Sequence, residues 1–340
     1  MFKTAMHSGL AALAVFVLGL FAPCAAQEPA PLKTAWLAEH EAFAAWYGKE
    51  MGWDKEAGFT LEMRRYGSGR ELIAGINESK WSIGACGALP ALAAVLESRI
   101  DIIGVGNDES FSTGIYARPD SPVLAKTGFN PAFPDMAGTP DSVKGKTILC
   151  PVGSSAFYTV AQWLHGLGLS VRDVTLRDVN PKTGLDAFAK GEGDLIAFWA
   201  PFTHEAEERG FMPVAMSNQC GASQPILLVA NQTFAAQHPE QVVAFLKMYF
   251  RGIDALRNAP REALIKDYQR FYREWTGREL SARAAAWELD KHPVYTLKEQ
   301  LAMFGPQGNL MEWLKRLAHF HGGDNRLKFV TDAYLKKAAE

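Results

Sequence analysis

Cysteine is scarce in this chain, with four among 340 residues. Cys24, Cys86, Cys150 and Cys220 have no partner at C-x-x-C spacing, so neither a zinc ribbon nor a dithiol redox centre is indicated. Removal of a leader that contains Cys24 leaves three thiols, and at least one of these is unpaired in a monomer. The spacing does not decide whether any two of them pair, and the fold is not built on disulfides.

Several signatures of catalysis are also missing. Six residues separate Gly138 from the Gly145-Lys146-Thr147 run, where a phosphate-binding P-loop has four, and the run opens a predicted strand. His40-Glu41 and His204-Glu205 lack the second histidine of a zincin helix, and no G-x-S-x-G elbow occurs. The motifs therefore indicate no catalytic residues, no metal site and no cofactor.

A strong charge of one sign is absent. The 35 basic and 37 acidic side chains give a net charge of −2, which points away from nucleic acid and from anionic membrane surfaces as partners. With 48% hydrophobic and 21% charged residues, the composition is that of a globular protein long enough for two domains.

Long apolar runs are confined to the beginning of the chain. Lys3 precedes an apolar run over residues 10–22, which is short for a membrane span, and Cys24-Ala25-Ala26 suits cleavage before Gln27. We therefore expect a signal peptide over residues 1–26, cleaved near Ala26, and a periplasmic protein. Lipidation of Cys24 is the alternative, although Phe21 and Pro23 are poor residues before a lipidated cysteine.

Two series of alternating strands and helices follow, which indicates an α/β fold with mostly parallel sheets flanked by helices. The first series has strands over residues 34–37, 59–66, 81–85 and 100–105, with helices over 69–78 and 89–97. The second has strands over 146–150, 174–179, 194–199 and 212–216, with helices over 156–167, 184–190 and 201–209. A last strand is expected over 226–230, and the chain is mostly helical from His238 onward.

The helical tail is too long to serve a sheet of its own, so we expect it to pack on the first domain. Residues 27–118 and 225–340 then form a discontinuous domain I, and residues 119–224 form domain II. Five prolines over residues 119–140 suggest a connection between the domains. The chain would cross near Arg118 and return near Gln224, giving a two-stranded hinge that suits closure around a ligand.

The stretch from Cys150 to Phe157 is a candidate anion site. Residues 146–150 read as a buried strand and residues 156–167 as a helix, so Gly153-Ser154-Ser155 forms a strand-to-helix turn. Free backbone N–H groups and hydroxyls at such a turn favour an anion at the positive end of the helix dipole. The alternative is a helix that one of the two serines merely caps.

Other turns follow predicted strands at the sheet edge where α/β proteins bind ligands. Each has a structural explanation, and Ser68-Gly69-Arg70-Glu71 is a capping box. Together they aim hydroxyls and N–H donors from both domains at one cleft. The candidate ligand-binding residues are His40, Gly67, Ser68, Gly69, Gly87, Ala88, Leu89, Asn107, Asp108, Glu109, Gly153, Ser154, Ser155, Phe157 and Trp199.

Over about residues 33–260 the chain resembles the periplasmic solute-binding proteins of ABC importers for aliphatic sulfonates, taurine and nitrate. The marks, in order, are Gly67-Ser68-Gly69, Gly87-Ala88-Leu89-Pro90, Arg118-Pro119-Asp120-Ser121-Pro122, Lys144-Gly145-Lys146, Gly153-Ser154-Ser155-Ala156-Phe157-Tyr158, Trp199-Ala200-Pro201-Phe202 and His238-Pro239-Glu240. The resemblance implies a type II periplasmic-binding fold without catalysis. It also implies a monomer that delivers a small organic anion of sulfonate type to a permease and its ATPase.

One departure bears on the ligand. Relatives often carry Trp-Asp-Pro where this chain has Trp199-Ala200-Pro201, so one carboxylate for a ligand ammonium is missing. That counts against a taurine-like zwitterion unless Asp108 or Glu109 substitutes. Phe111, Phe157 and Trp199 could line an apolar wall for an organic tail.

Two further readings share the fold. One is a binder of a neutral thiamine-pyrimidine precursor. The other is an enzyme that resembles the thiamine-pyrimidine synthases, which would have a cysteine cluster, a lysine holding pyridoxal phosphate and no leader. The scattered cysteines and the predicted leader speak against the enzyme. The sequence leaves the identity of the ligand open.

Overall fold

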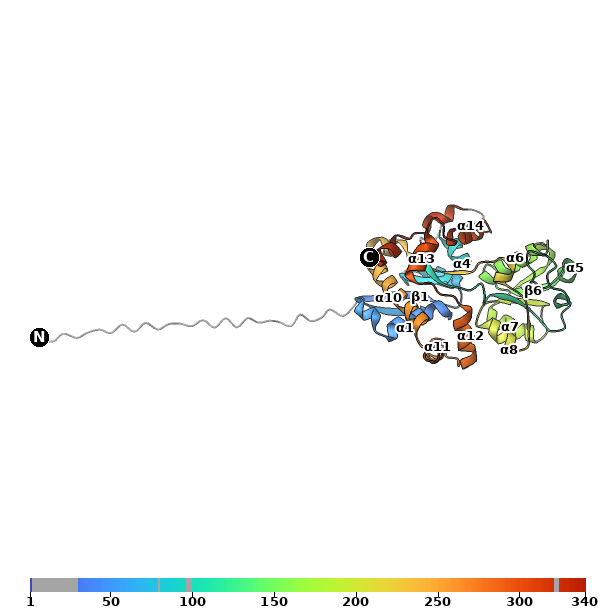
Figure 1. The fold of residues 1–340 in the computed structure, drawn as a ribbon, viewed down its shortest axis with the longest axis horizontal. Coiled ribbons are helices and arrows are strands. Elements are labelled where there is room, and N and C mark those ends of the chain that lie inside the picture. Colours follow the sequence, from blue (N-terminus) through green and yellow to red (C-terminus); the bar gives the residue numbers. More distant parts are fainter. Residues whose placement is uncertain (2–29, 79, 96–99, 321–323) are drawn as a thin grey trace.

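The computed structural model describes residues 30–78, 80–95, 100–320 and 324–340, together with Met1. The predicted signal peptide and Cys24 lie outside the described residues. None of the helices in the described part of the chain is long and apolar enough to cross a membrane. The structure consists of two lobes, each built on one sheet (Figure 1).

The sheet of the first lobe has five strands in the order β2-β1-β3-β10-β4. Strand β1 runs parallel to β2 and β3, whereas β10 is antiparallel to both β3 and β4. The strands are β1 (Ala30–Trp36), β2 (Phe59–Arg65), β3 (Ile83–Gly87), β4 (Ile100–Asp108) and β10 (Pro225–Asn231).

The sheet of the second lobe repeats this plan in the order β7-β6-β8-β5-β9. Strand β6 is parallel to β7 and β8, and β5 is antiparallel to β8 and β9. The predicted mostly parallel sheets are thus confirmed, each with one antiparallel member. The strands are β5 (Gly114–Ala117), β6 (Thr147–Cys150), β7 (Thr175–Asp178), β8 (Leu195–Phe198) and β9 (Met212–Met216).

Helices cover both faces of each sheet, because successive side chains of a buried strand point to opposite faces. Trp36 of β1 joins a cluster with Phe43 and Phe245, while its neighbour Ala35 joins a second cluster on the other face. In the first lobe the helices are α1 (His40–Glu50), α2 (Trp53–Glu56), α3 (Gly69–Ala74), α4 (Ala88–Ala94), α9 (Gln232–Gln237), α10 (Pro239–Asn258), α11 (Arg261–Thr276), α12 (Ala282–Lys291), α13 (Leu297–Phe304), α14 (Leu310–Phe320) and α15 (Ala333–Ala338).

The second lobe follows the same rule. Ile148 of β6 faces the cluster that includes Trp163 of α6, and Leu149 faces a separate cluster with Phe188 of α7. This lobe has α5 (Pro140–Val143), α6 (Ser155–Gly166), α7 (Pro181–Ala189) and α8 (Phe202–Glu208). Short 3-10 turns lie at 75–78, 122–125, 171–173, 217–220 and 324–329.

The chain passes between the sheets twice, from β4 to β5 and from β9 to β10. The two connections are hydrogen-bonded, because Glu109 N donates to Gln224 O (2.9 Å) and Gln224 N donates to Ser110 Oγ (3.0 Å). The first passage precedes Arg118, since the apolar run at 114–117 is an antiparallel strand of the second sheet. The division into domains and the hinge at these connections stay predictions.

The proline-rich stretch over residues 119–140 packs on the second lobe and does not connect the lobes. Ala137 N donates to Val214 O of β9 (2.9 Å), and Trp163 Nε1 of α6 donates to Ala137 O (2.9 Å). The prolines therefore belong to a segment that packs on the second lobe. That reading of the sequence was wrong because proline marks interruptions of regular structure without showing where the interrupted chain packs.

The helical segment after His238 packs on the first lobe. Tyr249 of α10 donates to the backbone oxygen of Glu41 (3.1 Å), and Trp46 Nε1 donates to Glu274 of α11 (3.2 Å). Cys86, Cys150 and Cys220 are buried, unpaired thiols. Burial raises the pKa of the Cys220 thiol to about 12, so it stays protonated at neutral pH.

Candidate ligand-binding cleft

The carboxyl ends of the parallel strands in both sheets open onto one cleft between the lobes. It consists of three adjoining hollows that share Trp199. The Ser68 hollow has a volume of about 290 Å³, and the Tyr66 hollow has a volume of about 420 Å³. The third, which we call the Glu109 hollow, measures about 30 Å³.

The N-terminus of α6 forms one wall. Gly153 has a φ of +79°, a conformation that side chains disfavour, so glycine is needed at this turn. Ser154 is the N-cap: its hydroxyl accepts from Phe157 N (3.4 Å) and donates to Pro151 O (2.6 Å). Ser155 begins the helix, is buried and lines the Glu109 hollow. Both serines line the cleft, but the Ser154 hydroxyl is occupied by capping.

The turn after β2 forms part of the opposite wall. Ser68 Oγ accepts from Glu71 N (3.2 Å), and the Glu71 carboxylate accepts from Gly67 N (3.0 Å). The first bond is an N-cap and occupies the Ser68 side chain, whereas the Glu71 carboxylate bonds to Gly67 N in place of the Ser68 N–H that the predicted capping box requires. Arg70 extends from the same turn across the cleft, where its guanidinium donates to Val152 O (2.6 Å).

Two buried carboxyl groups meet beneath Trp199. Glu39, between β1 and α1, hydrogen-bonds to Glu109 and also to the Trp199 side chain, whose indole N–H is the donor. Burial raises the pKa of Glu39 well above its usual range, and repulsion from Glu109 adds to this. Burial likewise raises the pKa of Glu109, followed by repulsion from Glu41. Two such acids in contact share a proton.

His40, adjacent to Glu39, points into the core. Its ring stacks on His292 (centroids 5.1 Å apart) and on Tyr268 (5.6 Å). His292 Nδ1 lies 2.7 Å from the backbone oxygen of Glu288 and 3.3 Å from its carboxylate. Burial raises the pKa of Glu288 to about 8 and lowers that of His292 to about 4, so both are neutral at pH 7.

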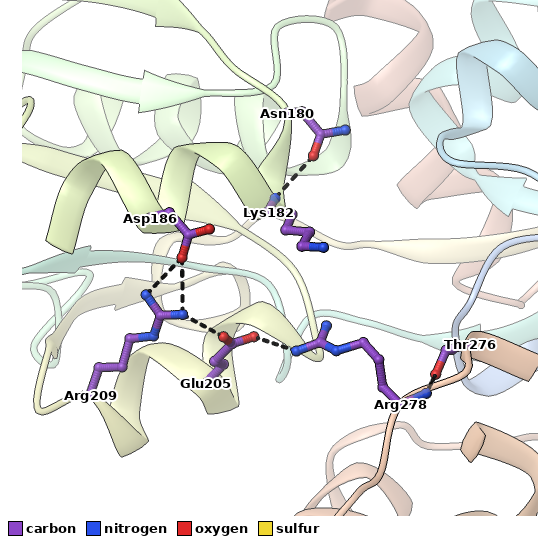
Figure 2. A network of polar contacts seen from close by, with 7 residues as sticks. All are labelled: Asn180, Lys182, Asp186, Glu205, Arg209, Thr276 and Arg278. Carbon is purple, nitrogen blue, oxygen red and sulfur yellow. Dashed lines mark hydrogen bonds and ion pairs between the residues drawn. The ribbon is translucent and has the colours of Figure 1, made fainter. Parts of the chain in front are cut away.

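A chain of ion pairs links the lobes at the rim of the cleft. Figure 2 shows Glu205 of α8 between two arginines, Arg209 of the same helix and Arg278 from the segment before α12. Glu205 lies 2.7 Å from Arg209 and 3.2 Å from Arg278, and Arg209 also pairs with Asp186 (3.1 Å). Of these contacts only the one with Arg278 crosses between lobes.

The Arg278→Ala substitution is expected to shift the ligand-free protein toward an open cleft. An exposed ion pair contributes about 0.2–1 kcal/mol, so the shift in the closed-to-open ratio should be about fivefold at most. The radius of gyration from small-angle scattering should rise, and added salt should have the same effect on the wild type. Arg209→Ala, which breaks pairs within the second lobe, is the control. Equal radii for both variants would contradict a role in closure.

Comparison with known proteins places these features in context. Residues 136–263 match the family model described as NMT1/THI5 like. The chain is 22% identical over 246 residues to a protein of Brachyspira hyodysenteriae named as an ABC transporter periplasmic binding protein, covering 72% of this chain and 70% of the relative. It is 26% identical over 200 residues to the taurine-binding periplasmic protein of Escherichia coli, covering 57% and 56%.

Solved structures extend the likeness to nearly the whole chain. The periplasmic aliphatic sulphonate binding protein SsuA from Escherichia coli superimposes with a TM-score of 0.67 at 17% identity, covering 91% of this chain and 97% of SsuA. The periplasmic nitrate-binding protein NrtA from Synechocystis gives 0.68 at 12% identity, covering 92% and 89%. The fold is that of a periplasmic solute-binding protein. The resemblance predicted from the sequence is therefore confirmed, and these named relatives are binding proteins, not enzymes.

In this solute-binding fold, most of the residues selected from the sequence line the cleft. Nine of them do so: Gly67, Ser68, Gly69, Gly87, Glu109, Gly153, Ser154, Ser155 and Trp199. Their role in binding stays a prediction.

The other six lie away from these hollows. Ala88 and Leu89 are buried in the hydrophobic core, Asn107 is fully buried, and Phe157 contacts Phe320. The Asp108 carboxylate accepts from Ser110 N and Oγ (2.9 and 2.5 Å), and His40 stacks on His292 as described. The contacts of these six residues are structural, and the sequence alone does not reveal them.

Sequence reasoning overlooked Glu39 as a site residue, although it chose His40 from the same turn. Glu39 follows a strand end and occupies the N-cap position of α1 without capping it, which leaves its carboxyl free for the cleft. A carboxylate at a predicted N-cap is the signal that could have found it. Arg70 and Asn180, which also line the Ser68 hollow, carried no such signal.

Proposed function

We propose that this protein is the exported solute-binding component of an ABC importer and that it captures a small organic anion, of sulfonate type, between its lobes. Export, with cleavage of the leader near Ala26, and delivery to a membrane permease with its ATPase are parts of this proposal. The periplasmic relatives support them. The observation that carries the ligand class is the N-terminus of α6, which opens into the cleft.

The physical argument rests on the first turn of that helix. A helix leaves its first backbone N–H groups without intrahelical partners, and the helix dipole adds partial positive charge at the same end. Phe157 N is satisfied by Ser154, whereas the Ser155 side chain lines the cleft beside the remaining donors. Arg70, in the neighbouring Ser68 hollow, adds positive charge nearby. An anion with several acceptor oxygens suits this wall.

Alanine substitution separates the two serines. Ser155→Ala is expected to weaken binding of ethanesulfonate about ten- to a hundredfold, since a hydrogen bond to a charged group contributes about 1.5–3 kcal/mol. Ser154→Ala, which removes the N-cap, should lower the free energy of unfolding by about 1 kcal/mol and change affinity little. Calorimetric titration and thermal melting on both variants measure the two effects.

The control is a thermal-shift screen of the wild type over sulfonates, nitrate, carboxylates and pyrimidines. A ligand that binds the folded state raises the melting temperature by mass action. Stabilisation by pyrimidines alone, or a Ser155→Ala variant that binds ethanesulfonate like the wild type, would contradict the proposed ligand class.

A further inference from the structure

The Glu109 hollow is the smallest of the three, and both lobes contribute to it. Glu39 and Glu109 come from the first lobe, whereas Ser155 and Trp199 come from the second. Its volume of about 30 Å³ is far smaller than the volumes of about 290 and 420 Å³ of the other two hollows. A ligand can therefore place one small terminal group here, and larger substituents must stay in the two wider hollows.

Glu109 has an unfilled hydrogen-bonding position in this hollow. Its side chain is 1% exposed, and its Oε1 atom has no hydrogen-bond partner. Glu39 lines the same hollow, so the two carboxyl groups together present a buried acceptor that no donor in the described part of the chain fills. A buried acceptor without a donor is costly, so it points to a donor that arrives with the ligand.

The electrostatic surroundings select the sign of that donor. The neighbouring ionisable side chains that act on the pair are Glu41 of α1, Asp108 at the end of β4 and Glu288 of α12, all of them carboxyl groups. Two carboxyl groups against further acids make the floor of the hollow negative whenever the pair ionises. A cation of ammonium size lowers the free energy of that ionised state more than a neutral donor does.

We propose that the Glu39–Glu109 pair binds a primary ammonium group of the ligand, so that the imported solute is a small zwitterion with its anionic end at α6. This inference deepens the proposed function and rests on it. When the ammonium enters, the proton shared by the two carboxyl groups leaves to solvent. The ammonium keeps its own protons and donates them to the carboxylates. This pair also supplies the carboxylate that the Trp199-Ala200-Pro201 sequence lacks.

The test compares two ligands of equal size by calorimetric titration at pH 7. Taurine and 1-propanesulfonate differ only in an ammonium group against a methyl group. Wild-type protein is expected to bind taurine about ten- to a hundredfold more tightly, with proton release visible as a dependence of the heat on the buffer. Glu109→Gln and Glu39→Gln should reduce this preference to about threefold or less.

Glu288→Gln is the matched control, because Glu288 is a buried carboxyl near the pair that does not line the cleft and is neutral at pH 7. It should keep the preference for taurine. Where a variant melts below the assay temperature, the wild-type comparison of the two ligands still decides.

Each outcome has one meaning. Equal affinity of wild type for both ligands, or tight binding of N,N,N-trimethyltaurine, overturns the ammonium subsite and leaves the anion proposal in place. Binding of propylamine without any sulfonate supports the subsite and overturns the anion. Failure of every amine-bearing probe to bind overturns the subsite.

Discussion

Replacement of Gly252 by valine is expected to lower the free energy of unfolding by about 3 kcal/mol or more. Gly252 lies on the buried face of α10 where that helix crosses α1. A Cβ atom at this position would lie 2.8 Å from the backbone oxygen of Ala44, and a backbone atom cannot move aside as a side chain can. The two helices would have to separate, which opens voids in the core around Phe43 and Phe245.

The same helix crossing offers a matched control. A Cβ atom on Gly48 of α1 would meet the sulfur of Met248, the mobile end of a flexible side chain. Gly48→Ala should therefore change stability by less than about 1 kcal/mol, because relief of glycine's helix cost offsets the repacking. Urea denaturation of both variants measures the difference. Equal stabilities would show that the helix crossing tolerates a wider spacing.

Local patterns in the sequence predicted most of the fold. The strand at 146–150, the turn at Gly153 and the helix from 156 onward are all present within a residue or so. Apolar runs bounded by glycine and serine fix such units, because burial and capping both act within a few residues. The order of the units then dictates parallel strands joined by helices, and hence a cleft at their carboxyl ends.

What the sequence could not predict depends on contacts between distant residues. The run at 114–117 is too short to identify as a strand until β8 and β9 lie on either side of it. Phe157 was expected in the cleft because it follows the serine turn, yet it packs against Phe320, far along the chain. Propensity and periodicity carry no information about such pairings.

The buried carboxyl groups at the cleft and behind it are the clearest such case. Glu39, Glu109 and Glu288 are separated by 70 and 179 residues in the sequence, and each would ordinarily be expected at the surface. Folding places all three in one buried region, where their mutual repulsion and loss of solvation keep protons bound. Keeping these carboxyl groups buried and protonated costs stability at neutral pH, where the unfolded chain would release the protons.

That cost is measurable at Glu288, where the expected effect of substitution is large. The pKa of Glu288 is raised from about 4.5 in the unfolded chain to about 8 by burial. Between these values the folded state holds a proton that the unfolded state releases. The stability that this bound proton contributes is therefore fully present below pH 4.5 and is lost as the pH rises toward 8. Over that range the free energy of unfolding falls by about 1.4 kcal/mol per pH unit.

Glu288→Gln, which is neutral at every pH, should remove this loss. At pH 8 the variant is expected to be more stable than the wild type by roughly 3–5 kcal/mol, and near pH 4.5 the two should be similar. Urea denaturation at several pH values from 4.5 to 8 gives the two curves.

The other buried groups alter both curves equally. Glu39, Glu41 and Glu109 have raised pKa values, so they favour low pH in the same way. His40 and His292 have lowered pKa values and act in the opposite sense: for His292, stability is lost as the pH falls from about 6.5 to about 4. The difference between variant and wild type isolates Glu288 from all of these.

Glu279→Gln, at an exposed carboxylate, controls for the loss of a surface charge. If the difference in the free energy of unfolding between variant and wild type stays constant from pH 5 to 8, the prediction is wrong. Glu288 would then be ionised in the folded protein and paired with a protonated His292.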